Sequence, residues 1–183
     1  PNTRIINLSI GDPVRQLAVT MSPIARLLDF LAYKYRILFI ISAGNHPEII
    51  NYVSKTFDEL KALDPTTRNS VFGKAIKENQ RNLKVLAPAE SLNGLTIGAL
   101  YNDFSTITED DRFILAVEKG MPSPISAVGK GYRSIITPDL FYYGGVKYIR
   151  KQLDGNSAWA ISTRMPGCLS AAPYGTGDVD GCA

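Results

Sequence analysis

The sequence predicts an α/β fold in which a mostly parallel sheet carries helices on both of its faces. Residues 4–10 and 37–41 are short, strongly apolar runs, and residues 22–35 between them repeat apolar side chains at helical spacing. Strands this apolar are typical of parallel sheets that are covered on both sides. A strand, a crossover helix and a second parallel strand form one right-handed βαβ unit. We therefore expect a three-layer architecture, with both strands buried on both sides.

The carboxyl ends of the two predicted strands indicate where a ligand would bind. Two loop tips follow the strands: Ser9, Ile10 and Gly11 after the first, and Ala43, Gly44 and Asn45 after the second. In parallel sheets, ligands bind beyond the carboxyl ends of the strands. We expect the Ser9–Gly11 tip and the Ala43–Asn45 tip to be neighbours and to form the site.

The helix between these strands has a clear beginning and one apolar face. Ser22 is a suitable N-cap, and Pro23 suits the first helical position. The side chains expected to pack on the sheet recur at helical spacing: Ile24, Leu27, Leu28 and Leu31.

Two further helices are expected at 47–82, separated by a break at 64–67 in which Thr66 or Thr67 is a candidate cap. Residues 95–99 have the composition of a strand, as do residues 148–152 and 159–162. Pro138 and Asp139 are typical turn residues, and we assign Asp139 a structural role in binding backbone N–H groups.

The composition is that of an ordinary globular domain. The 183 residues, of which 45% are hydrophobic, suit one domain with a sizeable core. The net charge of +3 is mild and the basic residues are scattered, which argues against a nucleic-acid partner. No run of about 18 apolar residues occurs, so we expect no membrane association. Cys168 and Cys182 allow one disulfide, but a reducing compartment suits them equally, so their redox state stays open.

The residues at the ends of the two predicted strands resemble those in the core of the subtilisin-like serine peptidases, the subtilases. Ile5–Gly11, then a helix, then Leu38–Asn45 carry the resemblance. The resemblance continues downstream. Residues 86–100 resemble the family's proline-containing turn followed by a buried strand, and residues 122–131 resemble its Ser-x-x-Gly segment. Residues 135–145 resemble its Lys-Pro-Asp turn followed by a glycine pair. The resemblance implies that residues 1–183 are part of a subtilase catalytic domain, of the three-layer α/β kind.

The resemblance also implies roles for the two loop tips. The Ser9–Gly11 tip would pair with the backbone of an extended peptide substrate. Ala43 and Gly44 would flank the substrate side chain that precedes the scissile bond. The Asn45 side-chain amide would donate a hydrogen bond to the oxyanion that forms from the peptide carbonyl. The sequence departs from the family pattern where Thr137 replaces the usual lysine. Residues 47–82 are expected to be a helical insertion beside the cleft, without an assigned role.

The sequence contains none of the short motifs that carry the family's catalytic triad. No Asp-Ser-Gly, Asp-Thr-Gly, His-Gly or Gly-Thr-Ser occurs, and the sequence begins almost inside a strand, which suggests a segment excised from a longer catalytic domain. The single histidine, His46, is expected to be a partly exposed loop residue and not a base. We therefore expect a peptidase parent and an inactive segment. The alternative is a non-catalytic α/β binding module or a pseudo-peptidase; a nucleotide-binding enzyme is disfavoured because no phosphate-binding glycine motif occurs.

No cofactor is required by the chemistry that the resemblance implies. Glu109, Asp110 and Asp111 offer oxygen ligands for a structural calcium ion, but a solvated acidic turn is the simpler interpretation, and no metal ligand is assigned. The substrate specificity and the oligomeric state stay open. The cellular compartment also stays open, with a cytoplasmic location slightly favoured over a secreted one.

Overall fold

The computed structural model divides the chain into two compact units, each of which is described separately. The described residues are 3–17, 20–102, 113–146, 148–151 and 159–162. The first unit consists of residues 1–46, 79–98 and 125–142, and the second of residues 47–78, 99–124 and 143–183. Both units are therefore built from segments that are separated in the sequence.

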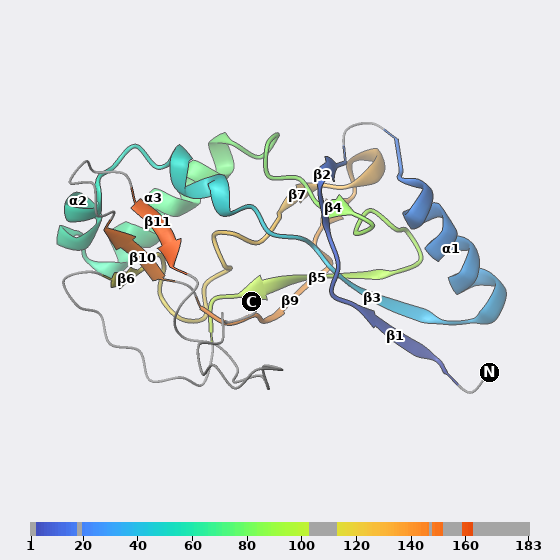
Figure 1. The fold of residues 1–183 in the computed structure, drawn as a ribbon. Coiled ribbons are helices and arrows are strands. Elements are labelled where there is room, and N and C mark those ends of the chain that lie inside the picture. The colour runs from blue at the N-terminus through green and yellow to red at the C-terminus, as the bar shows by residue number, and fades with distance from the viewer. Residues whose placement is uncertain (1–2, 18–19, 103–112, 147, 152–158, 163–183) are drawn as a thin grey trace, which may run out of the picture. The chain divides into compact units, whose positions relative to one another are not determined.

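The helices and strands are labelled in Figure 1. The helices are α1 (Pro23–Tyr35), α2 (Phe57–Ala62) and α3 (Pro65–Glu78), with two 3₁₀ segments, η1 (Pro47–Tyr52) and η2 (Tyr132–Ser134). The strands before residue 100 are β1 (Ile5–Leu8), β2 (Asp12–Gln16), β3 (Leu38–Ser42), β4 (Leu86–Ala87) and β5 (Leu95–Leu100). The later strands are β6 (Phe113–Leu115), β7 (Gly129–Lys130), β8 (Ile136–Thr137), β9 (Leu140–Tyr143), β10 (Tyr148–Lys151) and β11 (Trp159–Ser162).

The central sheet is mostly parallel, as predicted. Its strand order is β1-β3-β5-β9. β1 and β3 pair in parallel from Ile5 opposite Leu38 to Leu8 opposite Ile41, and β3 pairs in parallel with β5. The connection from β1 to β3 runs through α1, so the βαβ unit inferred from the apolar runs is confirmed.

Helix α1 begins where the sequence places it. The Ser22 hydroxyl oxygen accepts the Ala25 backbone N–H at 3.1 Å, and Pro23 occupies the first turn, where its missing N–H leaves no partner unsatisfied. The helix ends at Arg36, whose φ of 56° lies in the left-handed region. The predicted cap is confirmed.

The prediction of which face of α1 meets the sheet is partly wrong. Ala25, Leu28 and Ala32 are buried, whereas Ile24 and Leu27 are 51% and 53% exposed. Alanines let a helix backbone approach a sheet closely, so the buried stripe follows them and not the larger side chains. Leu28 and the partly buried Leu31 lie in the same hydrophobic cluster, as expected.

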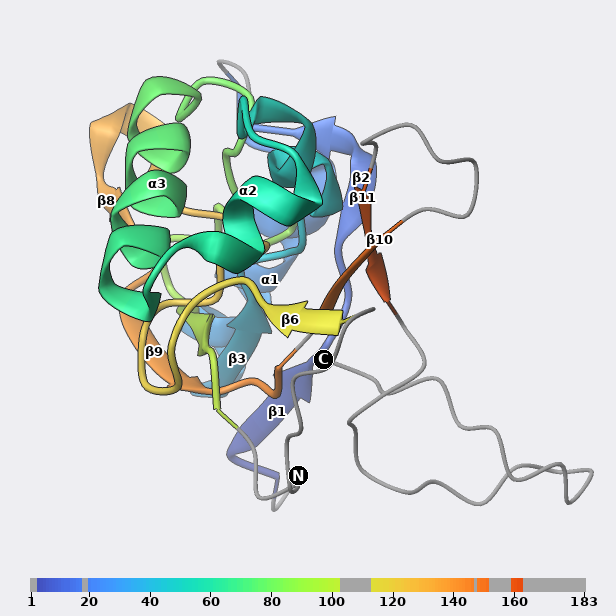
Figure 2. The ribbon, with the colours of Figure 1, turned by 90° about the vertical axis from the view of Figure 1, so that its left-hand side faces the viewer.

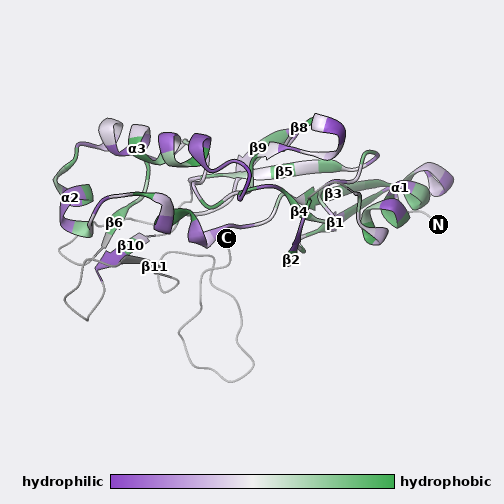
Figure 3. Ribbon diagram, turned by 90° about the horizontal axis from the view of Figure 1, so that it is seen from above, coloured by the Kyte–Doolittle hydropathy of each residue, from purple (hydrophilic) through white to green (hydrophobic). Residues whose placement is uncertain are grey.

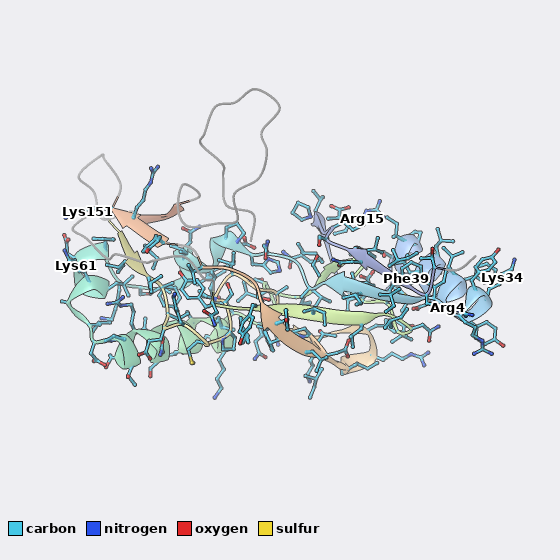
Figure 4. All side chains as sticks on the ribbon, turned by 90° about the horizontal axis from the view of Figure 1, so that it is seen from below. Arg4, Arg15, Lys34, Phe39, Lys61 and Lys151 are labelled. Carbon is cyan, nitrogen blue, oxygen red and sulfur yellow. The ribbon has the colours of Figure 1, made fainter. Side chains whose placement is uncertain are left out.

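That cluster is the core of the first unit. Phe39 and Ile41 of β3 are buried within it, and Figure 4 labels Phe39 on its strand. Figure 3 shows β3 as predominantly hydrophobic. Burying a side chain of this size contributes about 1.5–3 kcal/mol. The cluster comprises Leu17, Leu28, Ala32, Phe39, Ile41, Ala43, Val85, Ala89 and Ala127.

The expectation that both strands are buried on both sides is wrong for β1. Its residues alternate between exposed and half-buried, and Ile5 is 60% exposed. On β3, Leu38 is 40% exposed, while Phe39 and Ile41 are buried. β1 lies at the end of the strand order, so within the described part of the chain one of its backbone edges has no neighbouring strand.

The range 47–82 is largely helical, as predicted, but it forms three segments instead of two (η1, α2 and α3), and the last ends at Glu78 and not near residue 82. An apolar stripe along this range is buried in the second unit at Ile49, Ile50, Val53, Phe57 and Leu60. It is split because Thr56 starts a new helix, α2, within it. Figure 2 shows α2 and α3 with β6 in this unit.

The cap of α3 also differs from the prediction. The carboxylate of Asp64 accepts the Thr67 N–H at 3.0 Å, so the cap precedes the predicted Thr66 and Thr67, and the helix begins at Pro65. Hydrogen bonds from Thr67 hold the pKa of Asp64 below its usual value. The buried Arg68 on α3 donates to the carbonyl oxygens of Leu63 and Leu115 at 3.2 and 2.8 Å.

The C-terminal strands predicted at 148–152 and 159–162 are confirmed as β10 and β11, which pair antiparallel. Asp139 has the structural role expected of it: its carboxylate accepts the Thr96 N–H at 2.7 Å, across to β5. Cys168, Cys182 and the acidic run 109–111 lie outside the described residues. Within the described ranges, no helix combines the length and the hydropathy that crossing a membrane requires.

Candidate functional site

The two predicted loop tips begin at the same edge of the parallel sheet. Leu8 and Ile41 are paired residues near the ends of β1 and β3, and the Ser9–Gly11 and Ala43–Asn45 tips follow them directly. The parallel register therefore places both tips beyond the carboxyl ends of neighbouring strands, where open α/β sheets bind ligands. All of these residues belong to the first compact unit.

The tips are in contact. The Ser42 hydroxyl donates to the carbonyl oxygen of Ile10 at 3.2 Å. A Cβ added to Gly11 would lie 3.6 Å from the Cα of Gly44, which is ordinary van der Waals contact. Glycine at both positions thus allows two backbones to approach each other with little between them.

The first tip presents its backbone to solvent. Ser9, Ile10 and Gly11 are all exposed, and the Ile10 side chain is 51% exposed. Exposed, extended main chain offers N–H and C=O groups to which a peptide can pair. After Gly11 the chain becomes β2, which pairs antiparallel with β4. This pairing fixes the direction in which the tip leaves the sheet.

The second tip is held from two sides. The Ala43 carbonyl oxygen accepts the Leu86 N–H at 3.0 Å, and the Gly44 carbonyl oxygen accepts the Ala127 N–H at 2.9 Å. Asn45 forms an isolated antiparallel bridge with Ser126. Ala43 is buried, Gly44 is half-buried and Asn45 is exposed. The backbone that carries the Asn45 amide is therefore fixed while the residue itself faces solvent.

His46 is not the partly exposed loop residue that the sequence suggests. It is 2% exposed, and its Nε2 lies 2.7 Å from the carbonyl oxygen of Lys84, to which it must donate because a carbonyl oxygen only accepts. Its backbone N–H donates to Ile125 at 2.6 Å. His46 is therefore a buried residue that supports the loop through its ring and backbone hydrogen bonds.

Sequence reasoning missed one residue of the site, Leu86. A Cβ built on Gly44 would lie 2.5 Å from the Cγ of Leu86, and one built on Gly11 would lie 3.5 Å from the Cδ1 of the same leucine. Leu86 is 3% exposed. Its side chain therefore packs against both tips. The sequence placed residues 86–91 in a turn before a strand. The pairing of β4 with β2 and the hydrogen bond from Leu86 N–H to the Ala43 carbonyl oxygen bring Leu86 to the site.

The charged groups nearest to the first tip are exposed. The Asp12 carboxylate accepts the Val14 N–H at 3.0 Å, and the Arg15 Nε lies 3.7 Å from the same carboxylate. Arg15 is labelled in Figure 4. Such a solvent-exposed ion pair is worth at most about 1 kcal/mol. It contributes little to the shape of the site.

Together, the mostly parallel sheet and the two loop tips beyond the carboxyl ends of its strands define an α/β protein with its candidate site at this edge. A family model described as the subtilase family matches residues 1–176. The chain therefore belongs to the subtilase family, which comprises subtilisin-like serine peptidases, and the resemblance inferred from the strand ends is confirmed. No curated protein and no solved structure matches the chain significantly.

Proposed function

We propose that this chain forms the substrate-binding edge and the oxyanion hole of a subtilisin-like serine endopeptidase. The observation that supports the proposal best is the contact between the exposed Ser9–Gly11 tip and the turn that carries the exposed Asn45. An extended peptide paired with the first tip would lie beside the Asn45 amide, with Ala43 and Gly44 flanking the side chain before the scissile bond.

In the proposed reaction, a serine oxygen attacks the peptide carbonyl and the carbonyl oxygen becomes negative. Asn45 would donate its side-chain N–H to this oxyanion, and the interaction strengthens as the charge develops. The two backbone hydrogen bonds that flank Asn45 support this role, because they hold the donor in place before the reaction. The chemistry requires no cofactor, since the serine, its base and the oxyanion donors supply all of its parts.

The serine, the base and its orienting acid are not assigned to residues of this chain. The sequence contains none of the family's triad motifs, and its single histidine is buried against the Lys84 carbonyl. A nucleophile needs a base within hydrogen-bond reach. We therefore infer that the chain alone does not hydrolyse peptides.

A pseudo-peptidase is the second candidate, and the same lack of triad motifs favours it. The two tips would then hold an extended peptide without cleaving it. Sequencing the gene on both sides of this segment distinguishes the two candidates: the endopeptidase requires Asp, His and Ser motifs in the complete reading frame, and the binding protein lacks them.

The role of Asn45 is tested by Asn45→Ala in the full-length gene product. The substitution should lower kcat by roughly 10²–10³ with little change in KM, because the lost interaction is made mainly in the transition state. This magnitude is the one known for a side-chain oxyanion donor in subtilisin and is carried over from that enzyme. Asn82→Ala, which changes another exposed asparagine of the same unit, serves as the control. An unchanged kcat in Asn45→Ala would refute the assignment.

A further inference from the structure

We propose that Asn93 is a site of spontaneous deamidation, and that the carboxylate of Asp29 controls its rate by holding the turn that contains it. Asn93 is exposed and is followed by Gly94, and no other asparagine of the sequence is followed by glycine. The inference concerns a turn of the first unit and does not depend on the proposed peptidase chemistry.

The reaction needs only water and the two residues themselves. The backbone nitrogen of Gly94 attacks the side-chain carbonyl carbon of Asn93, and the new C–N bond closes a succinimide ring. The side-chain nitrogen leaves as ammonia after taking up the proton that the Gly94 nitrogen loses. Water then adds to one of the two ring carbonyl groups and opens the ring, which gives aspartate or isoaspartate. Glycine favours the attack because it has no side chain beside the attacking nitrogen.

Both residues of the pair have structural reasons to be there. A Cβ on Gly94 would lie 2.7 Å from the Cδ1 of Ile41 and 3.4 Å from the carbonyl oxygen of Phe39, so glycine lets β5 begin close beside β3. Asn93 supplies two donors to α1: its backbone N–H donates to the Asp29 Oδ1 at 2.8 Å, and its Nδ2 donates to the Asp29 carbonyl oxygen at 3.1 Å. The packing therefore retains a pair of residues that is chemically labile.

Asp29 holds this turn closed. Its Oδ1 accepts the Ser91 hydroxyl at 2.6 Å and the backbone N–H groups of Leu92 and Asn93 at 2.8 Å each. The Ser91 Oγ in turn accepts the N–H of Gly94, the nitrogen that would attack, at 3.2 Å. Ring closure brings this nitrogen to the Asn93 side chain, which is itself bound to α1. We therefore expect the reaction to proceed from a locally opened form of the turn, whose population Asp29 keeps low.

The product cannot restore the closed turn. The carboxylate formed at Asn93 has no N–H to donate to the Asp29 carbonyl oxygen, and its negative charge lies beside that of the Asp29 side chain. Isoaspartate also adds a methylene to the backbone just before β5. One reaction therefore weakens the attachment of α1 to the turn.

The first test incubates this chain in mildly alkaline buffer, with and without denaturing urea, and follows each asparagine by peptide mapping and mass spectrometry. Asn93 should react faster than any other asparagine in urea and more slowly in the folded chain. Asp29→Ala should accelerate the reaction of the folded chain at Asn93 by about tenfold or more, because it removes three hydrogen bonds to a charged acceptor. It should leave the rate in urea unchanged.

Two further variants accompany this comparison. Ser91→Ala removes one of the bonds to Asp29 and the acceptor of the Gly94 N–H, is the safer variant for folding, and should give a smaller acceleration. Asp12→Ala, which removes another carboxylate of the same unit that accepts a backbone N–H, should keep the wild-type rate at Asn93.

If Asn93 reacts no faster in urea than the other asparagines, the assignment of the site is overturned. The role of Asp29 is overturned if the wild type reacts equally fast folded and unfolded, or if folded Asp29→Ala and Ser91→Ala both keep the wild-type rate. Should Asp29→Ala not fold, the rate in Ser91→Ala decides.

The second test examines the consequence of the modification. Asn93→Asp carries the aspartate product and should unfold at a lower urea concentration than the wild type. Asn82→Asp, which makes the same change at another exposed asparagine of the first unit, should unfold at the wild-type concentration. Equal midpoints for Asn93→Asp and the wild type would overturn the inference that deamidation loosens the turn.

Discussion

Gly44 is constrained in two ways at the candidate site. Its φ of 100° lies in a region that side chains with a Cβ rarely adopt, and a Cβ there would lie 2.5 Å from the Cγ of Leu86. The residue also accepts a hydrogen bond from Ala127 through its carbonyl oxygen. The position of the Asn45 amide therefore depends on a residue that has no side chain.

Replacing Gly44 by alanine should destabilise the chain. The backbone conformation costs about 1–3 kcal/mol for a residue other than glycine, and overpacking against Leu86 adds about 1–3 kcal/mol. Urea denaturation monitored by circular dichroism measures the total loss in the free energy of unfolding. Gly73→Ala is the matched control with the opposite expected sign, because Gly73 lies within α3 with nothing near its missing Cβ, and alanine there should stabilise by about 0.5–1 kcal/mol. Equal stability of wild type and Gly44→Ala would contradict this account.

At the scale of the element, α2 shows how a short helix is defined by its first turn. The Thr56 hydroxyl oxygen accepts the Glu59 N–H at 3.2 Å, and the Glu59 carboxylate accepts the Thr56 N–H at 2.7 Å, which together form a capping box. The hydrogen bond from the Thr56 backbone and that from its side chain hold the pKa of Glu59 below its ordinary value. Glu59 therefore stabilises the helix as an anion.

The substitution Thr56→Ala should cost about 1 kcal/mol of stability and should raise the pKa of Glu59 toward its ordinary value. Because the folded pKa is lowered, the stabilisation by Glu59 is present above the unfolded pKa and is lost as the pH falls through the folded one. A carboxyl NMR titration of Glu59 in the wild type, Thr56→Ala and Thr56→Ser tests this directly. Thr56→Ser keeps the hydroxyl and should retain the lowered pKa; an identical titration of Glu59 in Thr56→Ala would contradict the prediction.

The elements that the sequence predicts best are those with a local signal. Ser22 and Pro23 mark the beginning of α1 because a cap and a fixed φ act within one turn. Thr56 and Asp64 were missed as caps for a different reason. Apolar residues continue at helical spacing across Thr56, and Asp64 is followed by Thr66 and Thr67, which are equally suitable cap types but lie inside α3. The burial of the α1 face was partly misjudged because alanine positions, which allow close approach, are less conspicuous in a sequence than leucines.

The candidate site was predictable to the extent that it follows from strand order. Two parallel strands joined by a helix place their carboxyl ends together, and the contact of Gly11 with Gly44 agrees with that expectation. Leu86 was not predictable because the pairing of β2 with β4 joins residues about seventy positions apart. No local pattern records such a long-range pairing.

At the scale of the whole molecule, the family assignment and the residues present lead to different expectations for peptidase activity. The family is one of serine peptidases, yet this sequence has one histidine, and its Nε2 is bound to a carbonyl oxygen. An activated serine requires an available base. Peptidase activity should therefore depend on residues outside these 183.

A serine-directed fluorophosphonate probe tests this dependence. The chain of 183 residues should show no labelling and no turnover of a fluorogenic peptide, whereas the full-length gene product should show both if it is the proposed endopeptidase. If the chain were labelled, and heat denaturation abolished that labelling, another group in the chain would have to activate a serine. A full-length product that binds peptides without labelling would support the pseudo-peptidase instead.

The division of the chain into two interleaved units also bears on how it is made. The polypeptide passes from one unit to the other after His46, Glu78, Gly98, Pro124 and Tyr142. The first unit therefore lacks its last segment until residue 142 has left the ribosome, and the second is completed later still. Pairings between distant segments slow folding, because the intervening loops must close first. Neither unit can therefore reach its native arrangement before its last segment, which begins at residue 125 in the first unit and at residue 143 in the second, has been made. Until then, nascent apolar segments are exposed to aggregation.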